Sequence, residues 1–217
     1  MNDAIDIYCE RLSPEFWAEP INAMTNASFF IAAALILWML RRSPDTPTLI
    51  LAILTICIGV GSFLFHTFAV GWAALSDVVP IALFISLAVG VALHRQFDIS
   101  VRLAVAGALA FTLLAPLVGL TPLDRLIPSG SVAYIPALLA LTFFAGVALW
   151  RRRAEAPALT AAAVTFGISL FLRSVDIAVC EAFPLGTHFL WHMFNAVTLY
   201  LVMRGLWRAG QPRTMPV

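Results

Sequence analysis

Residues 186–192 of this 217-residue chain read Gly-Thr-His-Phe-Leu-Trp-His and open its last hydrophobic segment. On a helix, the side chains of His188 and His192 project from one face, a single turn apart. That spacing allows both imidazoles to bind the same metal ion. Because an imidazole is a costly group in an apolar membrane segment, we expect both rings to face a cavity or a partner rather than lipid.

The composition around this stretch is typical of a membrane protein. The chain is 61% hydrophobic and 12% charged, whereas soluble domains are about 25% charged. Its net charge of +1 gives no electrostatic support for a nucleic-acid partner. All 13 basic residues are Arg, so no Lys is available to hold retinal as a Schiff base, and a rhodopsin-type photoreceptor is excluded.

Apolar segments occupy most of the chain after a short acidic head at residues 1–18. Each is near the ~20 residues that a spanning helix needs, and irregular backbone cannot cross lipid. We therefore predict a single domain over residues 1–217, an all-α membrane protein with a seven-transmembrane helix bundle. The predicted spans are residues 20–40, 48–69, 72–94, 101–119, 131–150, 157–177 and 186–207.

Arginine placement predicts the orientation of these spans. With seven spans, four groups of arginines fall on one side: Arg41 and Arg42; Arg95 and Arg102; Arg151, Arg152 and Arg153; Arg204, Arg208 and Arg213. The positive-inside rule then predicts an N-terminus outside and a C-terminus in the cytoplasm. An Arg-only, Ala-rich chain favours a bacterial inner membrane, with the site described next towards the periplasmic side.

The same topology brings four polar residues to the outer layer of the membrane. His66 lies near the outer end of the second span, and Asp77 lies one to two turns into the third. His188 and His192 occupy the first two turns of the seventh span. We predict that the three histidines bind zinc, which would leave the fourth tetrahedral position to water as in catalytic sites.

Two further side chains suit a hydrolytic reaction at such a metal. Asp77 could accept a proton from a zinc-activated water and pass it to a leaving group. Ser62, one turn before His66, could orient the water or donate to a developing oxyanion. The competing interpretation of each histidine is a packed, hydrogen-bonded side chain without a metal, but four such groups in one layer favour the metal.

The acidic head leaves two interpretations open. Oxygens of Glu10, Glu19 and Asn22 suit a hard cation such as calcium. Alternatively, these side chains form polar contacts at the start of the first helix.

Cysteines and one charged pair near the outer face raise further expectations. Cys9 and Cys180 lie outside the spans and are candidates for one disulfide, whereas Cys57 lies inside a hydrophobic run and is expected to be a packing residue.

Asp176 and Arg173 either pair with each other, or Asp176 supports the predicted metal site. We favour a structural role for this pair.

Three blocks of the sequence resemble the alkaline ceramidase family, within the wider group of seven-helix membrane hydrolases that includes the adiponectin-type receptors. The blocks are Tyr-Cys-Glu at residues 8–10 with Ala-Glu-Pro-Ile-Asn-Ala-Met-Thr-Asn at 18–26, Gly-Ser-Phe-Leu-Phe-His at 61–66 with Asp77 beyond it, and Cys180-Glu181 followed by residues 188–192. They share order and spacing over nearly the whole chain.

The resemblance implies a zinc-dependent hydrolase that cleaves the amide bond of a ceramide-like N-acyl lipid, releasing a fatty acid and a sphingoid base or other amine. It implies that His66, His188 and His192 ligate zinc. Asp77 would act on the zinc-bound water, and Ser62 would stabilise the oxyanion. The substrate would be a lipid reached from within the membrane.

The resemblance also extends to the head. It implies a Cys9–Cys180 disulfide and calcium ligands at Glu10 and Glu19. The chain departs from the family at Ile7 and Leu12, where the family has Asp and Asn.

Two other functions compete with the lipid amidase. The first is a seven-helix receptor or sensor with a structural zinc site, which would need neither Ser62 nor Asp77. The second is a transporter, for which broken spans and internal repeats are expected but not evident.

Overall fold

The structure is a computed structural model that describes residues 4–125 and 130–212. Over these residues the chain is largely α-helical and forms no β-strand. The α-helices are α1 Pro20–Thr25, α2 Ala27–Leu40, α3 Thr46–Phe68, α4 Gly71–Phe97, α5 Val101–Leu114, α6 Ile135–Trp150, α7 Ala156–Val175 and α8 His188–Ala209. Short 3₁₀ turns are η1 Ala115–Leu120, η2 Pro122–Arg125, η3 Ser131–Tyr134 and η4 Ile177–Val179.

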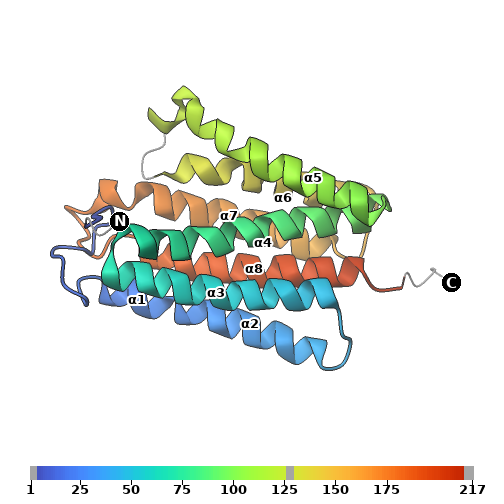
Figure 1. The fold of residues 1–217 in the computed structure, drawn as a ribbon, viewed down its shortest axis with the longest axis horizontal. Helices are drawn as coiled ribbons and strands as arrows, with labels where there is room; N and C mark the ends of the chain where they lie inside the picture. Colours follow the sequence, from blue (N-terminus) through green and yellow to red (C-terminus); the bar gives the residue numbers. More distant parts are fainter. Residues whose placement is uncertain (1–3, 126–129, 213–217) are drawn as a thin grey trace.

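Within the described residues, six helical stretches are long and apolar enough to cross a membrane: Pro20–Leu40, Thr46–Phe68, Gly71–Phe97, Val101–Leu120, Ser131–Trp150 and Ala156–Val175. The chain therefore has the all-α membrane bundle that the sequence predicts. The helix that carries the His-x-x-x-His pair, α8, is 22 residues long and runs along the same bundle (Figure 1). Its polar side chains make it less apolar than the other six, and its role as a seventh crossing stays a prediction.

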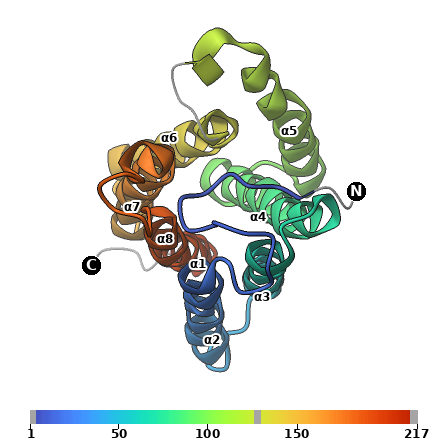
Figure 2. The ribbon, with the colours of Figure 1, turned by 90° about the vertical axis from the view of Figure 1, so that its left-hand side faces the viewer.

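Helix α8 packs against α1, α2, α3, α4 and α7. Figure 2, which looks along the helices, shows α8 next to α7 and close to α1, α3 and α4, with α5 at the periphery. Met203 and Leu206 of α8 are fully buried, in one cluster with Phe29 and Ile36 of α2 and Leu51 of α3. Burial of these apolar faces stabilises the bundle and fixes the position of α8.

The two ends of the bundle differ in sequence and structure. The head and the 176–187 connection lie at one end, and the α2–α3, α4–α5 and α6–α7 connections lie at the other, together with the end of α8 (Figure 1). The arginine groups of the sequence flank this second end, although Arg213 and residues 1–3 lie outside the described part of the chain. Because these arginine groups lie at the same end of the bundle, their placement agrees with the positive-inside argument. The orientation in the membrane stays a prediction.

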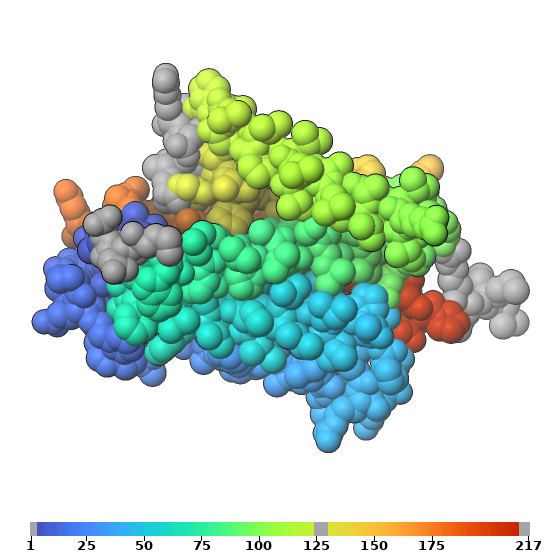
Figure 3. Space-filling model, in the orientation of Figure 1, coloured from blue at the N-terminus to red at the C-terminus, as the bar shows by residue number. Residues whose placement is uncertain are grey.

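The outer surface of the bundle is apolar. On α5, Leu103, Leu109 and Leu113 are exposed, and α5 stands out as a ridge beside the rest of the bundle in the space-filling view (Figure 3). Such a surface suits contact with lipid chains. Cys57 is also exposed, so the expectation that it packs in the interior is wrong: it points outward from α3.

Candidate metal centre

Three imidazoles from two helices meet in the interior of the head end. His66 lies in the last turn of α3, and His188 and His192 occupy the first two turns of α8. One ring nitrogen of each lies within 4.8 Å of those of the others, so the set could hold a metal ion. All three side chains are at most 2% exposed. The sequence-based expectation that these residues converge agrees with this geometry.

The ring nitrogen of His66 that points away from the other two histidines, Nδ1, forms a hydrogen bond with a carboxylate. Its Nδ1 lies 2.6 Å from Oε2 of Glu19. Burial disfavours the charged form of Glu19, but hydrogen bonds from His66, Asn22 and Arg11 lower its pKa below the ordinary value. An ionised carboxylate can only accept, so Nδ1 of His66 carries a proton, and in the neutral ring that metal binding requires, the lone pair is on Nε2.

The outer nitrogen of His192 is held in the same way by a hydroxyl group. Its Nδ1 lies 3.0 Å from Oγ1 of Thr25. That hydroxyl already donates its only hydrogen to the carbonyls of Ile21 and Asn22, at 2.8 and 3.0 Å. Thr25 therefore accepts from His192, and Nε2 of His192 also carries a lone pair.

These two lone pairs face each other. Nε2 of His66 and Nε2 of His192 are 3.1 Å apart, and when both rings are neutral with their protons on Nδ1, neither nitrogen has a proton to donate to the other. Nδ1 of His188 is also buried and has no hydrogen-bond partner among the described residues. A cation among the three rings would satisfy the facing Nε2 atoms of His66 and His192, and imidazoles with their second nitrogen bound to a carboxylate or hydroxyl, as in these two residues, are typical zinc ligands.

Local structure around residue 186 fixes the start of α8. Gly186 has φ +62°, a left-handed conformation that favours glycine. One carboxylate oxygen of Asp176 accepts hydrogen bonds from the amides of Thr187 and His188, at 2.6 and 2.9 Å. The other accepts from the amide of Cys9 at 3.0 Å. Asp176 thus holds the first turn of α8 and ties it to the head.

A disulfide joins the same two segments, between Cys9 and Cys180, as the sequence predicts. Of the two alternatives for Asp176, these contacts favour support of the metal-centre helix, because both of its oxygens bind backbone amides. Arg173 donates instead to the hydroxyl of Tyr8, at 3.1 Å.

Ser62 and Asp77 meet beside the histidines where α3 and α4 cross closely. A Cβ atom on Gly61 would overlap the carbonyl of Ser76, so only glycine permits this approach. The Ser62 hydroxyl can hydrogen-bond the Asp77 carboxylate. Both side chains line a cavity of about 190 Å³ together with His188 and His192, which is room for more than one water.

Sequence reasoning missed four residues of this cavity: Tyr8, Tyr134, Arg173 and Asn195. The Tyr8 ring stacks on His188, with centroids 3.6 Å apart. The Arg173 guanidinium lies 5.6 Å from the ring centroids of Tyr8 and Tyr134. Burial raises the pKa of Tyr8, so its hydroxyl keeps its proton. Two signals were available: Arg173, a charge near the outer face that the sequence analysis assigned to a pair with Asp176, and Asn195, a polar residue three positions after His192 in an apolar segment.

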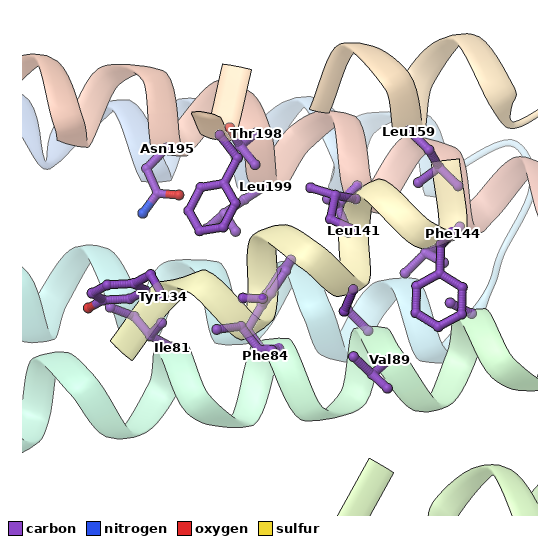
Figure 4. Close-up of a pocket in the computed structure, with 18 of the residues that line it drawn as sticks. Ile81, Phe84, Val89, Tyr134, Leu141, Phe144, Leu159, Asn195, Thr198 and Leu199 are labelled. Atoms are coloured by element: carbon purple, nitrogen blue, oxygen red, sulfur yellow. The ribbon is translucent and has the colours of Figure 1, made fainter. Parts of the chain in front are cut away.

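An apolar pocket continues from this cavity towards the other end of the bundle. The two share Ile58, Ile81, Tyr134 and Asn195 in their walls. In Figure 4, Tyr134 and Asn195 lie at one end of the pocket, and Phe144 and Leu159 lie at the other. Side chains of five helices line it, from α3, α4, α6, α7 and α8.

Comparison with known proteins gives one assignment. The sequence matches the ceramidase family over residues 7–209. The chain belongs to the ceramidase family. No curated protein matches it. The matched range includes the head from Ile7 and all three histidines, so the family assignment covers the whole candidate site of this ceramidase-family protein. It supports ceramide hydrolysis as the activity and a lipid as the substrate.

Proposed function

We propose that this protein is a zinc-dependent amidase that hydrolyses a ceramide-like N-acyl lipid within the membrane. The observation that carries the proposal is the pair of Nε2 atoms of His66 and His192, which lie 3.1 Å apart while Glu19 and Thr25 bind the Nδ1 atoms of the same rings. With His188 they offer three neutral nitrogen donors, the set typical of catalytic zinc. A zinc ion held there would supply a Lewis acid and a water of lowered pKa.

Ser62 and Asp77 supply the groups that move protons and bind charge. In amide hydrolysis, water adds to the carbonyl carbon, the C–N bond breaks, and the nitrogen leaves with a proton as the amine. Asp77 lines the cavity and would take the proton from the attacking water and return it to the leaving nitrogen. Ser62 would donate its hydroxyl hydrogen to the oxygen that becomes negative.

The surroundings of the cavity suit a lipid amide. Its neighbouring pocket is walled almost entirely by apolar side chains, so an acyl chain would bury its surface there favourably. The shared Tyr134 and Asn195 would then lie where the polar part of the lipid meets the chain. Arg173, held over the aromatic rings, would keep Tyr8 against His188.

The proposed location follows from the arginine distribution. With the arginine-flanked end in the cytoplasm, the histidines lie towards the outer face, which in a bacterial inner membrane is the periplasmic side. The Cys9–Cys180 disulfide suits that oxidising compartment.

The test is purified protein, metal analysis and a panel of N-acyl lipids. We expect stoichiometric zinc, and fatty-acid release from at least one ceramide-like lipid that stops on chelation and returns with added zinc. Zinc without fatty-acid release from any lipid, together with a conformational change on lipid binding, would instead establish the receptor. A protein that binds no zinc would contradict both.

A further inference from the structure

The three predicted calcium ligands, Glu10, Glu19 and Asn22, are already bound to protein donors. The two oxygens of Glu10 accept from the amides of Ile21 and Asn22, at 2.7 and 2.8 Å. One oxygen of Glu19 accepts from Arg11, and the other from His66 and the Asn22 side chain. Only Oδ1 of Asn22 has no partner among the described residues. Since calcium takes 6–8 oxygen ligands, these residues do not fit a bound calcium ion as they stand.

The oxygen atoms of the head surround a positively charged side chain, the guanidinium group of Arg11. The Arg11 side chain is 5% exposed. Its Nε donates to Glu19 at 2.5 Å. Its terminal nitrogens donate to the carbonyls of Ser13, Glu15 and His66, at 3.1, 3.4 and 2.9 Å. One carboxylate and three carbonyl oxygens are the kind of ligands that calcium prefers, yet here they surround a guanidinium group.

We propose that the guanidinium of Arg11 takes the place of a calcium ion in the head, so that the protein is independent of calcium, and that Arg11 is a positioning residue for His66. It holds His66 twice, through the carbonyl in the last turn of α3 and through Glu19 on Nδ1. A cation is favourable at the C-terminus of a helix, and the planar fork of Arg fixes both contacts at once. Ile7 and Leu12 agree with this replacement, because no acidic or amide ligand is needed at either position.

The first experiment measures calcium binding by the whole protein in detergent, after treatment with a calcium chelator. Titration calorimetry with calcium chloride should give no binding heat. The melting temperature should be equal in chelator and in millimolar calcium. Stoichiometric calcium binding, or a melting temperature raised by calcium but not by magnesium, would overturn the proposal.

The second experiment compares Arg11→Ala with Arg41→Ala, an exposed arginine at the opposite end of the bundle. Removing one partner of a buried ion pair leaves Glu19 uncompensated, so Arg11→Ala should melt roughly 10 °C lower in chelator. Millimolar calcium, but not magnesium, should restore part of that loss. Arg41→Ala should melt like the unaltered protein. An Arg11→Ala protein with unchanged melting, or one that calcium does not restore, would refute the replacement.

Cobalt(II) reports the effect on the histidines. Bound in place of zinc, it should give a visible spectrum that changes in Arg11→Ala and returns towards the original in Arg11→Lys, which keeps the charge without the fork. An unchanged spectrum in Arg11→Ala would refute the positioning role. If Arg11→Ala does not fold, Arg11→Gln, which removes the charge but keeps a long polar side chain, provides the same measurement, and an unchanged spectrum there would likewise refute the positioning role. The cobalt readout rests on the proposed metal centre, whereas calcium binding does not, and neither requires hydrolysis.

Discussion

Charged side chains form hydrogen bonds at both ends of the helical bundle, but the two ends use these bonds differently. At the arginine end, Arg95 binds Asp45 and the carbonyl of Leu206, and Arg151 binds the carbonyl of Gln96. There each hydrogen bond joins a donor to an acceptor. At the head end, hydrogen bonds to the outer nitrogens of two imidazoles leave two acceptors facing each other. The hydrogen-bonded charges at the arginine end therefore do not mark a functional site, whereas the close approach of two imidazole nitrogens at the head end does.

We expect the greatest loss of function when one of the three histidines at the head end is removed. His192→Ala removes one ring nitrogen of the metal set, so zinc and hydrolytic activity should both be lost. Changes to hydrogen-bond partners of metal ligands cost about 10–100-fold in affinity, and loss of a ligand should cost more. The control is His94→Ala, an exposed histidine at the arginine end whose Nδ1 contacts the carbonyl of Ile99. Metal analysis of both proteins checks this, and a His192→Ala protein with full zinc would exclude His192 as a ligand.

The next effect separates catalysis from metal binding at the head end. Asp77→Asn removes the proton acceptor of the cavity but none of the three imidazoles, so activity should fall by about 10²–10⁴-fold while zinc is retained. Asp6→Asn, an exposed carboxylate at the same end, should leave both unchanged. Fatty-acid release and zinc content are measured together. Full activity in Asp77→Asn would remove Asp77 from the mechanism.

A smaller effect tests how the head end is held together. Gly186→Ala places a Cβ where Asp176 and Cys9 lie, at a left-handed φ of +62°, so the free energy of unfolding should fall by about 1–3 kcal/mol. The matched control is Gly146→Ala in α6, where a Cβ meets nothing within 4 Å and should stabilise the helix by roughly 0.5–1 kcal/mol. Chemical denaturation in detergent gives both values. Equal stability of the two variants would contradict the role of Gly186.

The smallest effect is a pH dependence at the arginine end. Burial opposes ionisation of Asp45, but hydrogen bonds from Arg95 and Thr48 and the charge of Arg95 lower its pKa below 3.8. The pair therefore stabilises the fold fully when the pH is above the ordinary pKa of an aspartate. This stabilisation is lost as the pH falls through the lowered pKa of Asp45 in the folded protein. Because both side chains keep some contact with solvent, the effect should be about 1 kcal/mol.

Asp45→Asn checks the sign. Denaturation curves of the two proteins should differ at neutral pH and converge as the pH falls below 3.8. A difference that grows on acidification would show that Asp45 destabilises the fold.

The sequence predicted the helical bundle because its evidence is local. Apolar runs near 20 residues, with prolines and arginines between them, predict membrane helices without reference to neighbours. In the same way, four-residue spacing alone places His188 and His192 on one face of α8. Family resemblance added the Cys9–Cys180 disulfide, which the structure contains.

The sequence did not reveal the breaks within the first and fourth apolar segments. Asn26 separates α1 from α2, and the segment after Leu114 continues as the 3₁₀ turn η1. Hydropathy averages over such changes, because it records composition and not hydrogen-bond pattern.

By itself, the sequence determined the membrane-helix class, the pairing of His188 with His192 on one helical face and the asymmetry of the arginines, since each depends on spacing along the chain. The hydrogen-bond partners of the metal-centre rings depend instead on the tertiary structure. Glu19 is 47 positions from His66, and Thr25 is 167 positions from His192. Arg11 lies 55 positions from His66, whose carbonyl accepts one of its hydrogen bonds. Hydrogen-bond partners are set by which helices pack together, and no periodicity in the chain encodes that packing.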